Sequence, residues 1–278
     1  MAGEVAAAGS LAEDLAPGTR VTANPLVTCG VCEPCQRGRP TVCESRHLLG
    51  LDMPGCFAEY VAAPRRNIFR IPDGMDYSKA SMAEPLSTSV NVFTSHARLP
   101  VSSVAVFGSG PQGLLALQVA RAAGASKVFV VDVNESRLAV AKRLGATHVI
   151  NASSCDPVAA VVEMTGGRGC DVVVEASGRS AVRLQCVKAA ARSGIVALVG
   201  LGEPAAEFDC LDIVNREVEL HGVYAYTPAN FRRALDLIAE GRVDVTSWVG
   251  EGRLEDGQKI MEKLTSNPGD LIKVSFKL

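Results

Sequence analysis

The middle of the chain alternates short apolar runs with longer segments in which apolar residues recur every three or four positions. The apolar runs have the length of buried strands and occupy residues 102–107, 127–131, 148–150, 171–175, 195–199 and 218–224. The helical segments lie at residues 114–123, 135–144, 157–165, 182–191 and 229–240. Repeated units of this kind predict a doubly wound parallel α/β sheet, in which ligands bind beyond the carboxyl ends of the strands.

The last of these helices carries both start and stop signals. Thr227 is placed to cap it, Pro228 suits its first turn, and Gly241 ends it. Its apolar residues form one stripe, which consists of Phe231, Ala234, Leu235 and Ile238. The segment therefore predicts an amphipathic helix.

The pattern differs at both ends of the chain. Before residue 85 the sequence is rich in Gly and Pro, with strand-like pieces at residues 3–7, 19–23, 57–62 and 67–71. Short pieces of this kind predict small β-barrel material. Beyond about Gly241 the chain again looks unlike the sheet segment, and residues 270–278 predict a terminal strand.

Composition and charge mainly exclude certain classes of protein. The chain has 278 residues, 47% apolar and 21% charged, and its net charge of −2 does not favour nucleic acid. No apolar run approaches eighteen residues, and the first residues carry Glu4, Glu13 and Asp14 without a basic cluster. These features argue against a membrane span and a secretory signal. Nine cysteines, four of them clustered, favour a reducing cytoplasm.

The cysteine cluster has metal-ligand spacing. Cys29, Cys32, Cys35 and Cys43 follow the pattern C-x2-C-x2-C-x7-C. Four thiolates complete a tetrahedral shell around Zn²⁺ at about 2.3 Å and leave no open position for water or substrate. The pattern therefore predicts a structural zinc site.

Two other interpretations of the cluster remain open. Four unrelated cysteines or disulfides fit the two-residue spacings less well than a shared metal does. An iron–sulfur cluster is the sharper alternative, because its bacterial run is C-x2-C-x2-C-x3-C-P. Here the last gap is seven residues and Glu44 follows Cys43 where that run has Pro.

A glycine-rich turn follows the apolar run at 102–107. The residues from Gly108 to Gly113 read GSGPQG, which fits G-x-G-x-x-G in its required context between a strand and a helix. The glycines let the backbone approach a pyrophosphate, and the helix N-terminus offers free N–H groups. We expect Gly108, Gly110, Pro111 and Gly113 to contact a dinucleotide in a Rossmann domain; a simple βαβ turn with incidental glycines is the alternative.

The next strand ends in a residue that selects the cofactor. Asp132 follows Gly113 by nineteen residues, close to the spacing of a ribose-binding acid. Its carboxylate accepts hydrogen bonds from both ribose hydroxyls of NAD, whereas a 2′-phosphate meets repulsion of about 4 kcal/mol at 4 Å and an effective dielectric of 20. Arg137 either contacts the ribose or adenine or is a solvated helix residue. These features predict NAD as the cofactor.

Loops after the later strands complete the predicted ligand-binding edge. They contain Ser177-Gly178, Gly200-Leu201-Gly202 and Ala225-Tyr226. The further candidate cofactor contacts are Ser177, Gly178, Gly200 and Leu201.

Together, these motifs make the chain resemble medium-chain zinc-dependent dehydrogenases of the polyol (sorbitol), threonine and alcohol dehydrogenase superfamily. The four-cysteine loop and the glycine turn are each specific. Further matching segments, among them AGEVAAAGS, AEPLSTSVN, DVVVEASG and ALVGLG, extend the resemblance over nearly the whole chain in family order. The resemblance implies a GroES-like catalytic domain at 1–86, a Rossmann domain at 87–241, and a C-terminal return to the catalytic domain at 242–278.

The resemblance also implies NAD(P)-linked oxidation of a secondary alcohol at a second, catalytic zinc. In the polyol and threonine branch, the glutamate of the AEPL segment lies beside that zinc, so Glu84 is the candidate catalytic residue. The alternative is a helix N-terminal acid favoured by the helix dipole. An alcohol or polyol substrate, a dimeric or tetrameric homo-oligomer and a cytoplasmic location are implied as well.

The chain departs from the family at its start. Family members carry a catalytic cysteine and a Gly-His-Glu segment immediately before the AGEV-like stretch, and Met1 lies at that stretch. We therefore expect the printed residues to lack the first barrel strands and the main catalytic zinc ligands. The GroES-like barrel is then incomplete, catalysis is impaired, and a catalytic zinc is expected only in a full-length form.

The remaining histidines and cysteines fall at non-motif positions. We expect His47, His96, His148 and His221 to be ordinary surface or core residues. The remaining cysteines are Cys56, Cys155, Cys170, Cys186 and Cys210. Cys56 replaces the usual Gly or Ala and is a weak candidate for a metal or oxidation role, and we expect the other four to be buried small apolar residues.

The resulting hypothesis is a zinc-containing, NAD-dependent polyol or secondary-alcohol dehydrogenase. One alternative is a catalytically inactive NAD-binding protein. A second is a zinc-free quinone reductase of the same superfamily, against which the four-cysteine loop and the Glu84 segment argue.

Overall fold

The structure, a computed structural model, describes residues 1–97, 100–266 and 269–278. The chain forms two compact units. The first contains Met1–Ser87 together with Ala225–Leu278, and the second contains Thr88–Tyr224. None of the helices in the described ranges is long and apolar enough to cross a membrane.

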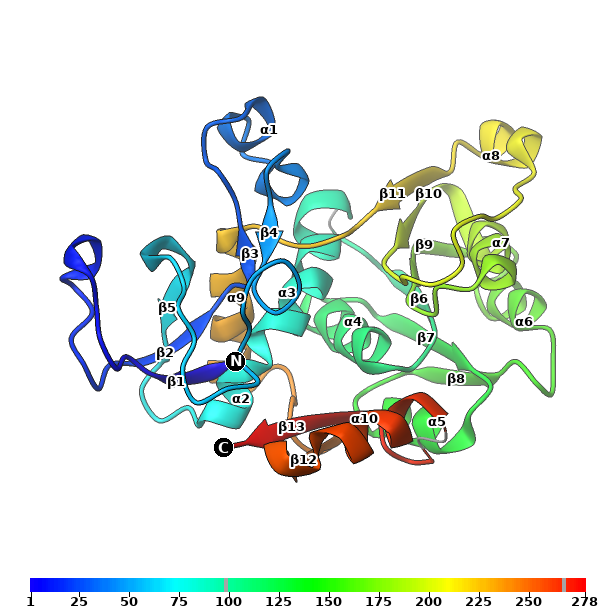
Figure 1. Cartoon of the computed structure of the whole chain (residues 1–278). Helices are drawn as coiled ribbons and strands as arrows, with labels where there is room; N and C mark the ends of the chain where they lie inside the picture. Colours follow the sequence, from blue (N-terminus) through cyan, green and yellow to red (C-terminus); the bar gives the residue numbers. More distant parts are fainter. Residues whose placement is uncertain (98–99, 267–268) are drawn as a thin grey trace. The chain divides into compact units, whose positions relative to one another are not determined.

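The second unit is built on a six-stranded parallel sheet (Figure 1). Its strands are β6 (Ser103–Phe107), β7 (Lys127–Asp132), β8 (His148–Asn151), β9 (Cys170–Glu175), β10 (Ala190–Leu198) and β11 (Glu219–Gly222). The order β11-β10-β9-β6-β7-β8 reverses between β6 and β9, since the chain builds outward from the centre in both directions. The predicted doubly wound sheet is therefore confirmed.

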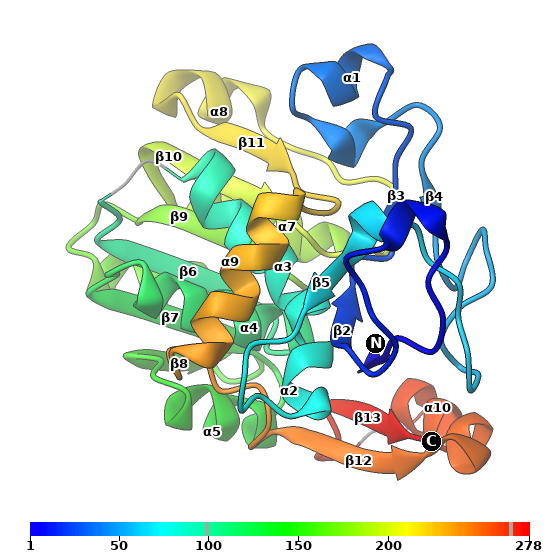
Figure 2. The ribbon, with the colours of Figure 1, turned by 90° about the vertical axis from the view of Figure 1, so that its left-hand side faces the viewer.

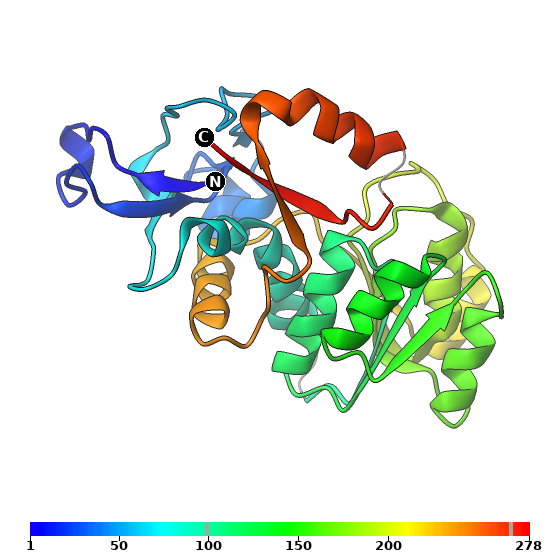
Figure 3. The ribbon, with the colours of Figure 1, turned by 90° about the horizontal axis from the view of Figure 1, so that it is seen from below.

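Helices cover both faces of this sheet, as Figure 3 shows from below. They are α4 (Pro111–Ala122), α5 (Glu135–Arg143), α6 (Pro157–Met164), α7 (Ser180–Ala189) and α8 (Cys210–Arg216). Phe107 and Phe129 of the sheet belong to one buried cluster with Val161 of α6 and Val187 of α7. Because strand side chains alternate between faces, Val104 and Val106 point to the opposite face, and they too are fully buried. The sheet strands are apolar on both faces for this reason.

The first unit contains smaller sheets (Figure 2). Its strands are β1 (Ala2–Glu4), β2 (Arg20–Ala23), β3 (Leu26–Val27), β4 (His47–Leu48), β5 (Ile68–Arg70), β12 (Val249–Arg253) and β13 (Lys273–Lys277). The pairings are β1-β2-β5 and β3-β4, both antiparallel, and β12-β13, which is parallel. Its helices are α1 (Glu33–Gln36), α2 (Tyr77–Ser81), α9 (Pro228–Ala239) and α10 (Gly257–Ser266), while α3 (Ala83–Asn91) contains the boundary at Ser87.

Helix α9 has the caps that the sequence predicted. The Thr227 hydroxyl accepts a hydrogen bond from the Asn230 N–H, and the Asn230 side chain accepts one from the Thr227 N–H, which completes a capping box. Its apolar stripe is buried, and the Phe231 ring lies 4.6 Å from that of Phe69 in the same unit. Residues 225–241 therefore pack with the first unit, although the sequence grouped them with the sheet segment.

The structure corrects several other sequence expectations. Residues 57–62 form no strand: Phe57 and Tyr60 are 65% and 76% exposed, because no described strand pairs with this segment. Cys155 and Cys210 are exposed and were wrongly expected to be buried. Both lie at the start of a helix, since Cys155 precedes the α6 cap and Cys210 opens α8. The elements α8, α10 and β12 had no clear sequence signal.

Candidate functional site

The glycine turn has the geometry that its sequence predicts. Gly108 has a φ of +98°, and a Cβ there would lie 3.1 Å from the backbone of Ala176 and Ser177. A Cβ on Gly113 would lie 1.8 Å from the Gly108 carbonyl oxygen, so only glycine allows α4 to pack this closely on β6. Gly110, by contrast, faces open space, with no protein atom within 4 Å of a Cβ.

Asp132 ends β7 beside this turn and already binds part of it. Its Oδ2 accepts hydrogen bonds from the Ser109 N–H at 2.6 Å and the Ser109 hydroxyl at 2.7 Å. Its Oδ1 accepts from the Val133 and Asn134 N–H groups at 2.7 and 3.0 Å. The position of Asp132 in the sequence predicted only a ligand-binding role. In the structure Asp132 also anchors the glycine turn, through its hydrogen bonds with Ser109.

Two polar atoms of the glycine turn and of the helix after β7 are buried and lack a hydrogen-bond partner. They are Oε1 of Gln112, in the glycine turn, and Nε of Arg137, in the first turn of α5. Buried polar atoms are almost always paired in proteins, so an unpaired one needs an explanation. A polar ligand at the carboxyl edge of the sheet supplies one. With the open face of Gly110, these atoms fit a bound dinucleotide.

The loops after β9 and β10 lie against each other. A Cβ on Gly200 would lie 2.1 Å from the Gly178 nitrogen, and one on Gly202 would lie 2.5 Å from the Gly178 oxygen. The structure thus brings the predicted residues Ser177, Gly178 and Gly200 together. Leu201 is 82% exposed on this double loop.

The four predicted zinc ligands lie in and beside the segment that contains α1, which Figure 1 labels. Their side chains converge. All four sulfur atoms lie within 4.8 Å of one another. The Cys43 sulfur lies 3.6 Å from that of Cys29 and 3.8 Å from that of Cys32. A tetrahedron with Zn–S bonds of about 2.3 Å has edges of about 3.8 Å. The cluster therefore fits one zinc ion.

The backbone around the cluster favours thiolate at one position. N–H groups of Val31 and Cys32 point at the Cys29 sulfur and lower the pKa of that thiol to about 6. Burial raises the pKa of the Cys35 thiol to about 12. Without a cation the Cys29 and Cys35 thiols thus differ widely in acidity, and a bound dication favours the thiolate form of its cysteine ligands.

Glu84, the candidate catalytic residue, lies in the first turn of α3 and is half-buried. Its Oε1 accepts a hydrogen bond of 2.8 Å from the Tyr226 hydroxyl, and Tyr226 is only 3% exposed. Burial and the Glu84 carboxylate raise the pKa of Tyr226 well above its usual value. The sequence predicts a loop at Tyr226 but carries no signal for this contact, since 142 positions separate the two residues.

Glu84 is not part of a metal-ligand group in the described ranges. There, the four-cysteine cluster is the only set of three or more His, Cys, Asp or Glu side chains arranged to hold an ion. A catalytic zinc normally needs three protein ligands. The described residues therefore do not form a catalytic zinc site.

The four histidines are exposed or half-buried, and none belongs to a metal-ligand group in the described ranges. The His148 ring stacks on Phe129 at 4.7 Å, and burial with Lys142 and Lys127 lowers its pKa. The His96 and His221 rings lie 4.8 Å apart, while His47 is exposed on β4. Cys56 is exposed, and Cys170 and Cys186 are buried as expected.

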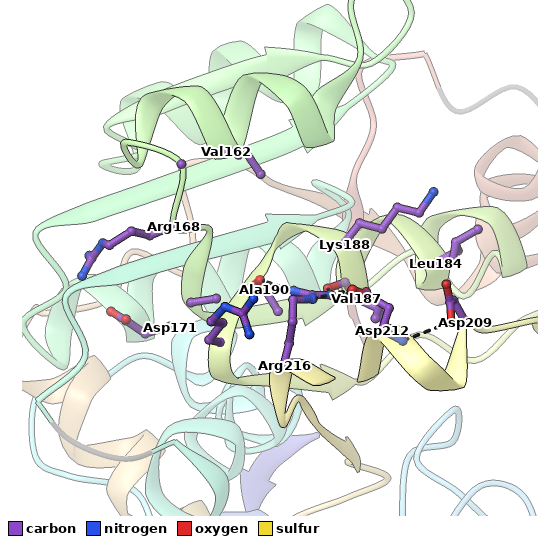
Figure 4. A pocket seen from close by; sticks show the side chains of 13 residues that line it. Val162, Arg168, Asp171, Leu184, Val187, Lys188, Ala190, Asp209, Asp212 and Arg216 are labelled. Atoms are coloured by element: carbon purple, nitrogen blue, oxygen red, sulfur yellow. Dashed lines mark hydrogen bonds and ion pairs between the residues drawn. The ribbon is translucent and has the colours of Figure 1, made fainter. Parts of the chain in front are cut away.

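A hollow of about 830 Å³ lies at the opposite end of the parallel sheet from the glycine turn (Figure 4). Asp171 and Ala190, near the amino ends of β9 and β10, line it. In it, Arg216 of α8 donates hydrogen bonds to the carbonyls of Val187 and Ala190 at 2.8 and 2.7 Å. Arg216 therefore closes the end of α7, and this hollow is separate from the predicted cofactor edge.

Two family models match the chain. The alcohol dehydrogenase GroES-like domain model matches residues 1–73, and the zinc-binding dehydrogenase model matches residues 111–240. The second match begins in the glycine turn and ends within one residue of α9. The first includes the four-cysteine cluster.

Known proteins resemble the chain along most of its length. It is 38% identical to an L-threonine 3-dehydrogenase of Bacillus velezensis over 260 residues, which cover 92% of this chain and 75% of that protein. It is 33% identical to a sorbitol dehydrogenase of Bacillus subtilis over 276 residues, covering 98% and 78%. The solved structure of a Sinorhizobium meliloti 1021 protein described as a zinc-binding dehydrogenase, bound to NADP, has a TM-score of 0.88 at 32% identity. The match covers 98% of this chain and 80% of that one.

Proposed function

The chain belongs to the zinc-binding dehydrogenase family, and from that membership and its site we propose that it transfers hydride between NAD and a polyol, a threonine-like amino alcohol or another secondary alcohol. The proposal rests on the arrangement of residues at the carboxyl edge of the sheet. That edge carries Gly110 with its open face, Asp132 anchored to Ser109, and two buried atoms without a hydrogen-bond partner, Oε1 of Gln112 and Nε of Arg137.

Residues at the carboxyl edge of the sheet match the parts of a dinucleotide cofactor. The free N–H groups at the start of α4 suit the pyrophosphate, and Asp132 suits a ribose diol. Gly108, Pro111 and Gly113 shape the turn, and the double loop at 177–178 and 199–203 lies beyond the adjacent strands. When bound, the nicotinamide cofactor supplies the hydride acceptor.

The four-cysteine cluster is proposed to hold a structural zinc through Cys29, Cys32, Cys35 and Cys43. Its closed shell has no room for substrate, so it supports the fold and does no chemistry. The cluster also argues against a zinc-free quinone reductase. Glu84 is proposed as the acid at the substrate site, oriented by Tyr226.

A cofactor reduction assay tests the proposed reaction. The protein, loaded with zinc, is offered sorbitol, other polyols, L-threonine and simple secondary alcohols with NAD or NADP, and absorbance reports the reduced cofactor. Turnover of one of these alcohols supports the proposal. Failure to bind NADH or NADPH in a direct titration contradicts it.

A second candidate is a protein that binds the cofactor without turning over alcohols. The observation that favours it is the isolation of Glu84 from any three-ligand group within the described part of the chain. Tight NADH binding without turnover of any alcohol, in protein shown to contain zinc, selects this candidate.

Assembly and location complete the proposal. The substrate is a small molecule, as in the family. We propose a homo-oligomer, because β11 ends the parallel sheet with one edge unpaired by any described strand. We also propose a cytoplasmic location, since all nine cysteines are free. Light scattering of the purified protein tests the first, and fractionation of the source cells tests the second.

A further inference from the structure

The last residue of β9 is a buried carboxylate for which the sequence analysis assigned no role. Glu175 is fully buried. Its Oε1 accepts three hydrogen bonds from the following loop: from the Ser177 N–H at 2.7 Å, the Ser177 hydroxyl at 2.6 Å and the Gly178 N–H at 2.8 Å. The side chain therefore fixes the backbone that leaves β9.

The same residue also binds the loop after β10. The Glu175 carbonyl oxygen accepts hydrogen bonds from the Val199 and Gly200 N–H groups at 2.9 and 3.0 Å. Arg183 of α7 donates to the carbonyls of Gly200 and Glu203, and its Nε lies 3.9 Å from Oε2 of Glu175. Glu175 and Arg183 thus connect the loop at 177–178 to the loop at 199–203.

The carboxylate is not fully paired within the protein. Oε2 of Glu175 is buried without a hydrogen bond, and a Cβ on Gly200 would lie 2.8 Å from it. Burying a charged group is costly unless it is paired and hydrogen-bonded. A connection needed only for folding could be made by apolar packing at lower cost. The charge therefore points to a role in holding these loops in one form.

The topology shows which half of a dinucleotide these loops face. Strands β6, β7 and β8 form one half of the sheet, and β9, β10 and β11 form the other, with the reversal between β6 and β9. A doubly wound sheet binds a dinucleotide across this reversal, one mononucleotide to each half. Asp132 ends β7 and faces the adenosine half. The loops after β9 and β10 consequently face the nicotinamide half.

We infer that Glu175, together with Arg183, is a positioning residue that holds the loops at 177–178 and 199–203 in the form that receives the nicotinamide half of the cofactor. This inference rests on the proposed function, because it assumes that the edge binds NAD. Neither side chain needs to touch the cofactor. Their effect reaches it through the backbone of Ser177, Gly178 and Gly200.

The test compares the affinity of NADH with that of AMP, which contains only the adenosine half. In Glu175→Gln the amide keeps an acceptor for the loop N–H groups but no longer attracts Arg183. We expect the Kd of NADH to rise about tenfold, or about 1.4 kcal/mol, and that of AMP to change by less than about twofold. The fluorescence emission of bound NADH should shift toward that of the free cofactor, because it reports the surroundings of the nicotinamide ring.

Arg183→Met provides a second variant that leaves the hydrogen bonds of Glu175 in place, so it decides the question if Glu175→Gln does not fold. It should raise the Kd of NADH in the same way. The double variant should add little to either single change, because the two residues act as one pair. Arg183→Lys, which restores the positive charge, should recover part of the affinity.

Glu163→Gln is the matched control, since Glu163 is an exposed glutamate on α6 of the same unit. It should change neither affinity. Equal losses of NADH and AMP affinity in Glu175→Gln would indicate general destabilisation and overturn the inference, as would unchanged NADH affinity in folded protein. An unmodified protein that binds AMP but neither NADH nor NADPH would instead contradict the proposed function.

Discussion

The Tyr226 hydroxyl donates a hydrogen bond of 2.8 Å to Oε1 of Glu84 within the first unit. Tyr226 immediately precedes the cap of α9, and Glu84 lies in the first turn of α3. The pair orients the only residue proposed for the substrate site. It also gives a buried phenol the partner that it needs.

Removing the Tyr226 hydroxyl should lower the stability of the protein. Because the acceptor is charged, Tyr226→Phe is expected to reduce the free energy of unfolding by about 1.5 to 3 kcal/mol in urea. A double-mutant cycle with Glu84→Ala, which removes the acceptor, should give a coupling energy of about 1 kcal/mol. Additive effects of the two substitutions would show that the hydrogen bond contributes nothing to stability.

The four-cysteine cluster should bind about one zinc per chain. Cys35→Ser removes one thiolate from the closed shell and should abolish tight binding. It should also loosen the loop around α1, since structural zinc contributes directly to folding. Elemental analysis after gel filtration measures the zinc, and limited proteolysis measures the loop.

Cys56→Ser is the control for this experiment, because Cys56 is an exposed cysteine of the same unit outside the cluster. Its zinc content should equal that of the unmodified chain. A second tightly held zinc would reveal a ligand set that the described residues do not show. Iron and acid-labile sulfide in place of zinc would select the iron–sulfur alternative.

Asp132 should make NADH bind more tightly than NADPH. The expected ratio is at least about tenfold, or about 1.4 kcal/mol. Asp132→Ala should erase most of that preference and weaken both cofactors, because the carboxylate also anchors Ser109 and the residues after β7. Fluorescence titration with each cofactor measures the ratio.

Ser109→Ala separates the two roles of Asp132. It removes one of the four donors but leaves the charge, so the ratio of NADH to NADPH affinity should persist. Equal titration curves for the two cofactors on the unmodified chain would contradict the assignment of NAD. The NADP bound to the Sinorhizobium meliloti relative makes this comparison necessary.

Asp171 should make the sheet unit sensitive to acid. Its Oδ2 accepts hydrogen bonds from the N–H and hydroxyl groups of Ser102 and Ser103. Burial raises the pKa of Asp171, but these hydrogen bonds outweigh burial and hold the pKa below its usual value. A lowered folded pKa gives stability that is present above the unfolded value, near 3.9, and is lost as pH falls through the folded value.

Asp171→Asn should therefore lower the unfolding free energy by about 1 to 3 kcal/mol at neutral pH and flatten its decline below pH 4. Urea unfolding between pH 3 and pH 7 measures both effects. Glu207→Gln, an exposed carboxylate in the same unit, should change neither. If the unfolding free energy of Asp171→Asn still fell below pH 4 as steeply as that of the unmodified protein, other groups would be responsible for the acid sensitivity.

The sequence alone predicted the strands and most of the helices of the sheet unit, its glycine turn and the clustering of four cysteines. These features depend on contacts between residues close in the chain. Gly108 and Gly113 act within one turn, the Thr227 cap acts within three residues, and the four cysteines span fifteen. Local spacing and apolar periodicity follow directly from such short-range geometry. The sequence therefore sufficed to predict these features.

Only the tertiary structure decided which distant residues complete each site. Tyr226 donates a hydrogen bond to Glu84, and Arg183 lies beside Glu175. Helix α9 packs in the first unit against Phe69. Folding brings these residues together from strands and helices far apart in sequence. The exposure of Phe57 and Tyr60 has the same origin, since a strand-like pattern forms a strand only when a partner edge lies beside it. Periodicity shows which face of a segment is apolar, but the three-dimensional arrangement decides what that face meets.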